Sequence, residues 1–252
     1  MSFNIAVAGK GGVGKTTVAG LLVRYLVERG LTPVLAVDAD SNTNLNEVLG
    51  LTVEFTLGDA REEMKKPSNQ SPSMTKDMFI EMRVNQCLVE STGFDLIAMG
   101  RPEGAGCYCA ANHLLTDCMD KLAGNYRYLV IDNEAGMEHI SRVTTQKVDL
   151  FLAISDTSRR GLTAARRVVE LAQEMNILTG KHYLVVSMAP EPVPDALRQA
   201  VEEVGLPVAG YIPQDAELAA WDLAGRPISQ LPAENPVVEA AFALFGRVVP
   251  EA

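Results

Sequence analysis

GKGGVGKT, at residues 9–16, directly follows the apolar run 3–8 and precedes a segment, 17–29, whose apolar residues recur at helical spacing. A glycine-rich loop between a strand and a helix lets successive backbone N–H groups point at one centre, to which the helix adds the positive end of its dipole. Lys15 is expected to reach the β- and γ-phosphates of a nucleoside triphosphate, and the Thr16 hydroxyl to ligate Mg²⁺. The flanking strand and helix favour this prediction over a glycine-rich turn without ligand. The residues expected to bind the nucleotide here are Gly9, Lys10, Gly11, Gly12, Val13, Gly14, Lys15, Thr16 and Thr17.

Length and composition favour one large domain. The chain has 252 residues, 47% of them hydrophobic, and no obvious low-complexity linker, so we expect a single P-loop ATPase domain over 1–252. No stretch of 18 apolar residues and no basic leader is present, which predicts a cytoplasmic protein without a membrane partner. The net charge of −10 argues against a nucleic-acid partner.

Short β-rich runs alternate with helical segments along the chain. This alternation is typical of an α/β fold, and we predict one doubly wound, mostly parallel sheet of seven or eight strands with helices on both faces. The strands are expected at 3–8, 33–38, 94–99, 128–132, 150–154, 182–187 and 207–212, and further helices at 112–122, 164–175, 194–204 and 236–248.

Carboxylates and glycines follow the strands at the edge where such sheets bind ligands. Asp38 and Asp40 end the second strand, and alternation along an extended chain sends both to the same side, facing Mg²⁺ and the γ-phosphate. The alternative is that Asp40 and its neighbours only cap the next helix. Asp132 ends the fourth strand and is expected to hold Mg²⁺ through its water shell, while Gly136 lets the backbone approach the γ-phosphate.

Lys10, in the second position of the loop, gives the motif a second lysine. The loop therefore resembles the deviant Walker A signature of the dimeric ATPases that include MinD, ParA, the nitrogenase iron protein and ArsA. The resemblance implies a homodimer that sandwiches ATP, with Lys10 reaching the partner's phosphates. It also implies that Lys10, Lys15 and Asp40 are catalytic, Asp40 orienting the attacking water, and that Asp38 and Asp132 lie near the metal.

Two further segments, RPEGAGCYC at 101–109 and DNEAGMEH at 132–139, resemble the CooC-type ATPases that mature nickel-dependent carbon monoxide dehydrogenase or acetyl-CoA synthase. Cys107 and Cys109 stand at i and i+2, so their thiols point the same way in an extended segment and fill half of a four-coordinate site. A symmetric dimer supplies the other half. Four thiolates suit Zn²⁺ or Ni²⁺, so the resemblance implies a metallochaperone that carries one of these ions.

Other sulfur and imidazole groups have weaker claims to the metal. A cysteine of a cytosolic protein is more often a buried small hydrophobe than a ligand, which is the role expected for Cys87 and Cys118. A structural role is favoured for His139, and His113 is not assigned to the metal. A disulfide across the single residue between Cys107 and Cys109 would be strained.

The base site departs from the pattern of the class. A residue after the sixth strand, commonly asparagine, helps to select adenine there, but this chain has Ser187, which offers one hydroxyl in place of an amide. Pro213 and Asp215 match the place where other members line the base. ATP rather than GTP is therefore an expectation of resemblance.

The sequence leads to one hypothesis with rivals. The hypothesis is an ATP-hydrolysing nickel metallochaperone whose client is carbon monoxide dehydrogenase, acetyl-CoA synthase or a related nickel enzyme. An iron–sulfur carrier or a reductase like the nitrogenase iron protein remains open, although no cysteine follows Asp132 to act as a second cluster ligand. A partitioning ATPase like MinD or ParA would need a basic surface or tail, whereas the C-terminal segment 242–252 is short and carries an acid, Glu251, beside its last residue.

Overall fold

The computed structural model describes residues 2–64, 76–100, 120–134 and 147–251. Strand β1 (Phe3–Gly9) and helix α1 (Lys15–Glu28) enclose the glycine-rich loop, as the sequence predicts. Residues 4–9 of β1 are all buried, with no alternation of buried and exposed positions. A strand of this kind lies in the middle of a parallel sheet that is covered on both faces.

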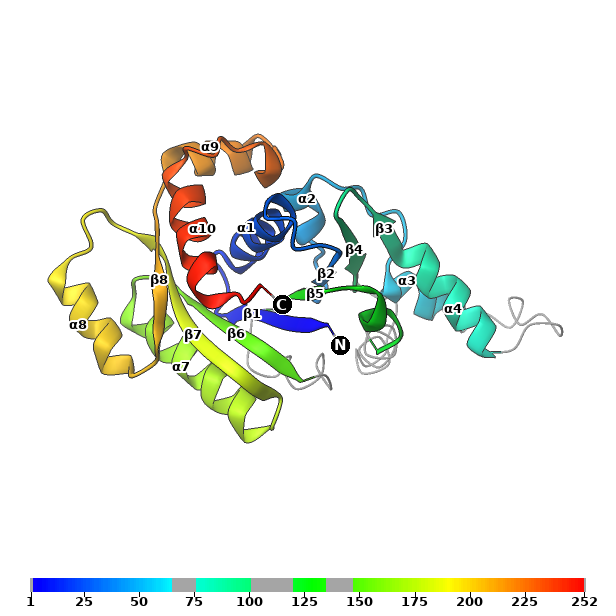
Figure 1. Cartoon of the computed structure of the whole chain (residues 1–252), viewed down its shortest axis with the longest axis horizontal. Coiled ribbons are helices and arrows are strands. Elements are labelled where there is room, and N and C mark those ends of the chain that lie inside the picture. Colours follow the sequence, from blue (N-terminus) through cyan, green and yellow to red (C-terminus); the bar gives the residue numbers. More distant parts are fainter. Residues whose placement is uncertain (1, 65–75, 101–119, 135–146, 252) are drawn as a thin grey trace.

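Eight strands form one sheet, in the order β3-β4-β2-β5-β1-β6-β7-β8 (Figure 1). All neighbouring pairs are parallel except β3 and β4, which are antiparallel, so the predicted fold class is confirmed. The remaining strands are β2 (Val34–Asp38), β3 (Leu88–Glu90), β4 (Phe94–Ala98), β5 (Tyr128–Asp132), β6 (Val148–Ser155), β7 (Leu178–Ala189) and β8 (Val208–Pro213). Because β1 lies between β5 and β6, where the strand order reverses, the glycine-rich loop emerges at the position that binds ligands in such sheets.

Two strands differ from the prediction. The edge strand β3 was not predicted, because three residues that are half-buried or exposed give no periodic signal. Strand β7 begins at Leu178 rather than at residue 182, because it starts with the polar, exposed residues 179–181, which pair with β6 across a register shift. In both cases strand formation depends on pairing with a neighbour rather than on local hydrophobicity.

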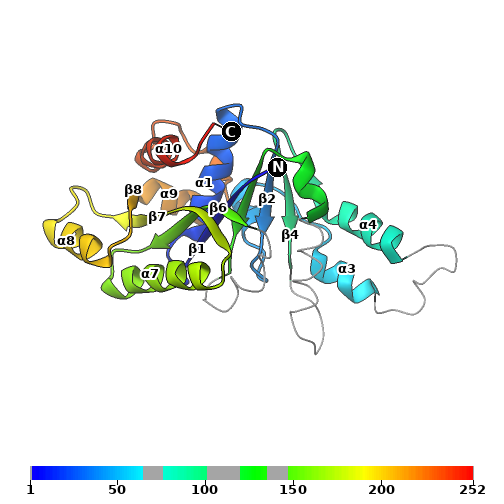
Figure 2. The same ribbon diagram turned by 60° about the horizontal axis from the view of Figure 1, so that its bottom comes forward.

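The helices cover both faces of the sheet. Helices α1, α2 (Leu45–Leu49) and α10 (Pro236–Val248) pack on one face together with the 3₁₀ turn η3 (Ile228–Gln230). On the opposite face, α3 (Leu57–Met64) and α4 (Lys76–Cys87) cover β2, β4 and β5, while α7 (Arg159–Glu174) and α8 (Asp195–Val204) cover β1, β6 and β7. Figure 2 shows α1 and α10 on one side of the sheet and α7 on the other. Helix α9 (Ala216–Leu223) follows β8.

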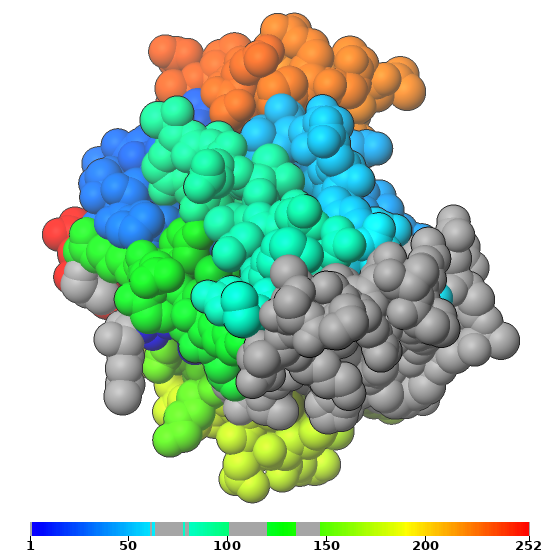
Figure 3. All heavy atoms as spheres, turned by 90° about the vertical axis from the view of Figure 1, so that its right-hand side faces the viewer, coloured from blue at the N-terminus to red at the C-terminus, as the bar shows by residue number. Residues whose placement is uncertain are grey.

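One cysteine that was predicted to be a buried core residue lies in the described part of the core. Cys87 is the last residue of α4 and is fully buried among the side chains of the cluster that joins α3 and α4 to the sheet, as expected. Figure 3 shows these two helices, in cyan and blue-green, on the molecular face next to β3. Within the described residues, the helices are too short or too polar to cross a lipid bilayer.

Candidate nucleotide site

The glycine-rich loop turns through two residues in the left-handed region. Gly12 has φ 78° and Gly14 has φ 79°, a conformation that favours glycine. Gly14 is also the residue that precedes α1, and its carbonyl accepts the N–H of Val18 at 3.0 Å. The first N–H groups of α1 are consequently left for an anion at the loop.

Lys15 lies almost completely inside the loop, with 8% of its surface exposed. Its Nζ donates a hydrogen bond to the backbone carbonyl of Lys10 at 3.3 Å. Burial lowers the pKa of Lys15, and the charges of Asp132, Asp40 and Glu134 oppose this effect. The side chain of Lys10 is exposed, so the two lysines occupy different environments.

Asp132 is buried at the carboxyl end of β5, with 1% of its surface exposed. The Thr16 hydroxyl hydrogen-bonds to its carboxylate, which joins two residues predicted to serve Mg²⁺. Burial raises the pKa of Asp132 to about 7, the hydrogen bond from Thr16 lowers it, and the nearby carboxylate of Asp38 raises it. Within the described residues, its Oδ1 atom is buried without a hydrogen-bond partner.

Asp38 lies directly beside Asp132 in the register of β2 and β5 and is fully buried. Its Oδ1 accepts the N–H of Asp40 at 3.0 Å and its Oδ2 accepts the N–H of Leu45, the first residue of α2, at 2.9 Å. Burial raises the pKa of Asp38 to about 6, against the effect of these backbone hydrogen bonds. Asp38 therefore caps α2 and fixes the loop that carries Asp40.

The Asp40 side chain does not cap α2, because it accepts hydrogen bonds from Asn42 and not from the first turn of the helix. The alternative role of Asp40 as a helix cap is therefore wrong, and Asp38 takes that role. Asp40 Oδ1 accepts hydrogen bonds from the backbone N–H of Asn42 at 2.9 Å and from Nδ2 of Asn42 at 3.1 Å. Asp40 is only half-buried and interacts electrostatically with Lys15 and Asp132. It is thus held close to the phosphate loop without being committed to a helix end.

These residues fit a hydrated Mg²⁺. Oxygen donors are the ligands that Mg²⁺ prefers, and it usually keeps several of its waters. A buried carboxylate oxygen without a partner can accept a hydrogen bond from such a water, and the Thr16 hydroxyl beside it can bind the ion directly. A divalent cation also offsets the repulsion between two adjacent carboxylates, which adds to the larger cost of burying them.

A pocket of about 560 Å³ extends from the glycine-rich loop to the ends of β7 and β8 and along one face of α9. Ser187, Pro213 and Asp215, the residues expected at the base site, all line it. The Ser187 Oγ, however, lies 2.7 Å from the carbonyl of Val13 and 3.1 Å from that of Ser155, so its proton is used to hold the loop. Asp215 Oδ1 accepts the N–H of Leu218 at 2.6 Å and thereby caps α9.

The sequence analysis did not predict that the end of α9 and the turn after it form one wall of the pocket. Trp221, Asp222 and Arg226 line this wall. A lone tryptophan in the sequence carries no motif, but the run 215–222 has the spacing of a helix with an aspartate cap, and this signal could have placed a helix beside the base site.

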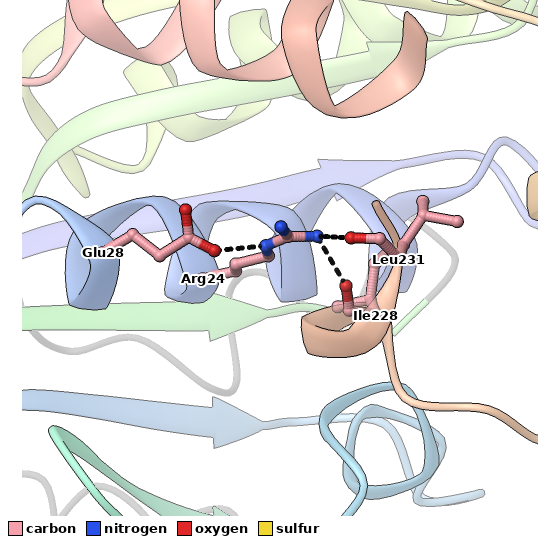
Figure 4. Close-up of polar contacts among 4 residues, drawn as sticks. All are labelled: Arg24, Glu28, Ile228 and Leu231. Carbon is pink, nitrogen blue, oxygen red and sulfur yellow. Dashed lines mark hydrogen bonds and ion pairs between the residues drawn. The ribbon is translucent and has the colours of Figure 1, made fainter. Parts of the chain in front are cut away.

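Arg24 connects α1 to the segment that follows this wall (Figure 4). Its Nη1 donates to the carbonyls of Ile228 at 2.9 Å and Leu231 at 2.7 Å, and its Nε donates to Glu28 at 2.6 Å. The side chain is buried. A buried guanidinium that donates to two backbone carbonyls is costly to remove, because the Leu231 carbonyl loses its donor and the Ile228 carbonyl keeps only the N–H of Leu231, at 3.2 Å.

We expect Arg24→Ala to lower the free energy of unfolding by about 2–4 kcal/mol, because it removes a buried charged donor from both carbonyls and leaves the carbonyl of Leu231 unpaired. Arg166→Ala is the matched control, since Arg166 forms an exposed ion pair with Glu170 on α7 and should cost less than about 0.5 kcal/mol. Urea unfolding of both variants measures the difference. Equal losses would contradict a special role of Arg24.

Three predicted site residues, Cys107, Cys109 and Gly136, lie outside the described residues, as do Cys118, His113 and His139. The described segment before the two cysteines is nevertheless informative. Strand β4 lies beside β2, with Ala98 opposite Asp38, and the N–H of Met99 donates to the backbone carbonyl of Asp38 at 2.8 Å. The chain therefore leaves β4 at the same edge of the sheet as the nucleotide loop.

Comparison with known proteins agrees with this geometry. The family described as CbiA, the CobQ/CobB/MinD/ParA nucleotide binding domain, matches residues 5–228. An ATP-binding protein of Methanocaldococcus jannaschii is 41% identical over 97% of this chain and 98% of its own length. The carbon monoxide dehydrogenase accessory protein CooC of Rhodospirillum rubrum is 31% identical over 88% of this chain and 87% of its own.

Among solved structures, the septum site-determining protein MinD of Pyrococcus horikoshii, complexed with Mg-ADP, superposes with a TM-score of 0.71 at 23% identity, covering 97% of this chain and 94% of that one. This likeness supports the fold. With the phosphate loop, the buried carboxylates and the family match together, the chain belongs to the CobQ/CobB/MinD/ParA nucleotide-binding family and is an ATPase.

Proposed function

We propose that this ATPase is a metallochaperone of CooC type, which binds nickel through Cys107 and Cys109 at a homodimer interface and delivers it to carbon monoxide dehydrogenase or a related nickel enzyme. The observation that carries the proposal is the Cys-x-Cys pair, in a chain 31% identical to a CooC protein along most of its length. Zn²⁺ is the alternative ion for the same thiolates.

The position of the pair in the chain supports a coupling between metal and nucleotide. Cys107 follows the end of β4 by nine residues, and β4 is hydrogen-bonded through Met99 to the backbone of Asp38. Asp38 in turn fixes the loop of Asp40. A change at the γ-phosphate that moves this loop therefore acts on the strand that leads to the two cysteines.

In the proposed cycle, Mg-ATP joins two subunits. Lys15 and the loop amides would hold the phosphates. Thr16 would bind Mg²⁺ directly, and Asp38 and Asp132 would hold the ion through its water shell. Gly136 is proposed to approach the γ-phosphate. Asp40 orients the attacking water, and Lys10 offsets the charge that develops on the phosphates of the partner, as an arginine finger does.

Closure of the dimer brings together two Cys-x-Cys pairs, and hydrolysis loosens both the dimer and its grip on the metal. Such coupling is reciprocal, so that metal must change nucleotide affinity by the same factor by which nucleotide changes metal affinity.

The test is a titration of Ni²⁺ and of Zn²⁺ into reduced, metal-free protein with ATP, with ADP and without nucleotide. We expect one metal per dimer, with an affinity that depends on the nucleotide and is lost in Cys107→Ser/Cys109→Ser. Cys87→Ala is the matched control, because this buried cysteine packs in the core and its removal should reduce stability without changing metal binding. Metal binding that survives in the double variant would contradict the proposal.

A second candidate, an iron–sulfur carrier, uses the same two thiolates. Anaerobic loading of the metal-free protein with iron and sulfide distinguishes the two, because only an iron–sulfur carrier would retain, after removal of unbound iron and sulfide, the cluster absorption at about 400 nm.

A further inference from the structure

Helix α9 ends in a turn that places an arginine on a tryptophan. Gly225 follows the helix with φ 62°, and its N–H donates to the carbonyl of Asp222 at 2.9 Å. The N–H of Arg226 donates to the carbonyl of Trp221 at 3.1 Å. These two bonds define a Schellman motif, in which the residue after the glycine contacts the side chain five positions earlier.

The contact here is a cation–π stack. The Arg226 guanidinium lies 3.4 Å from the centroid of the Trp221 ring. The indole is fixed from its other end, since Nε1 of Trp221 donates to the carbonyl of Pro227 at 3.1 Å. The planar, positively charged guanidinium is consequently held in one orientation against the indole and does not rotate freely.

The stacked pair of Arg226 and Trp221 lines the nucleotide pocket. Trp221 and Arg226 line the same pocket as Gly12, Gly14 and Thr16 of the loop, although they are far from the loop in the sequence. Figure 1 shows α9, in orange, beside α10. Among the described residues that line the pocket, Arg226 is the positively charged one, whereas Glu47, Asp215 and Asp222 carry carboxylates.

The distribution of charge separates the two ends of a bound nucleotide. Phosphates belong at the loop, where backbone N–H groups and Lys15 gather. The wall of α9 carries carboxylates, which repel phosphate, and a flat apolar and cationic surface, which suits a heteroaromatic ring. A purine base can stack on the outer face of the guanidinium, with the indole on the inner face.

We infer that Arg226, held flat by Trp221, binds the nucleoside part of ATP by stacking on its base. The inference rests on the ATP binding that the proposed function requires. It also gives a role in base binding to residues outside the site predicted from the sequence, where the Ser187 hydroxyl proton already holds the glycine-rich loop.

Trp221 is the single tryptophan of the chain and reports on its own surroundings. We expect ATP and ADP to change its fluorescence. Inorganic tripolyphosphate, which lacks a nucleoside, should compete with ATP for the loop but should not change the fluorescence when it binds alone. Arg226→Gln should weaken ATP binding about tenfold and leave the affinity for tripolyphosphate unchanged. Trp221→Phe, which keeps an aromatic ring, should bind ATP nearly as well as the wild type, and Trp221→Ala should bind it as weakly as Arg226→Gln.

Arg167→Gln is the matched control, because Arg167 is exposed on α7, on the opposite face of the sheet. Calorimetry measures the affinities, and circular dichroism checks that each variant is folded. If wild-type protein binds ATP but Arg226→Gln binds it equally well, the inference is overturned while the ATPase assignment stands. If the wild type binds neither ATP nor tripolyphosphate, the nucleotide site itself is refuted and the inference with it.

Discussion

Asp132→Asn is expected to reduce Mg²⁺-dependent ATP hydrolysis at least about 100-fold and, at the same time, to make the nucleotide-free protein more stable at pH 8. The buried carboxylate interacts unfavourably with Asp38, and burial raises its pKa to about 7 from an ordinary value of 3.8. Between pH 4 and 7 the folded state therefore binds more protons than the unfolded state, so this group's contribution to stability is lost as pH rises through that window. An amide carries no charge and avoids the cost.

The gain should be on the order of 1 kcal/mol or more at pH 8 and should become small near pH 4, where the folded-state carboxyl is neutral and the unfolded-state carboxyl is only partly ionised. Urea unfolding at the two pH values measures it, and phosphate release measures turnover. Asp149→Asn is the matched control, because Asp149 accepts the backbone N–H of Asn4 at 2.8 Å, a bond that an amide oxygen can also accept. A loss of stability in Asp132→Asn at pH 8 would show that the carboxylate is not a structural burden.

Lys10→Ala is expected to reduce ATP turnover by about 100-fold or more while leaving the affinity of the single subunit for ATP within about threefold of the wild type. Lys15 hydrogen-bonds to the backbone carbonyl of Lys10, so the substitution to alanine keeps this hydrogen bond. The exposed ammonium of Lys10 is then removed alone. In the proposed dimer this ammonium offsets the charge on the phosphates bound by the partner subunit.

Light scattering with a non-hydrolysable ATP analogue tests this role, because the variant should stay monomeric where the wild type dimerises. Lys181→Ala, at an exposed position of β7, is the control for loss of one surface charge. Unchanged turnover in Lys10→Ala would show that the cross-subunit role is wrong. Loss of ATP binding by the monomer would show instead that Lys10 acts within its own subunit.

Much of the fold follows from local patterns. The central strands are apolar runs with turn residues at their ends, and each predicted strand is present because burial on both faces of a parallel sheet requires this composition. The glycine-rich loop is equally local, since its conformation depends on glycines at the left-handed positions 12 and 14. The edge strand β3 could not be predicted, because its pairing with β4 and not its own sequence makes it a strand.

The sequence by itself determined the fold class, the phosphate loop and the set of acids around it, because each of these depends on residues that are close together in the chain. Only the tertiary structure decided how the acids divide their work: Asp38 caps α2, Asp132 keeps a buried oxygen without a described partner, and Asp40 stays beside Lys15. It also placed Arg226 and Trp221 in a pocket with a loop two hundred residues away. The physical reason is that hydrogen-bond partners and pocket walls are chosen by which chain segments meet after folding, and a side chain's local sequence does not specify that meeting.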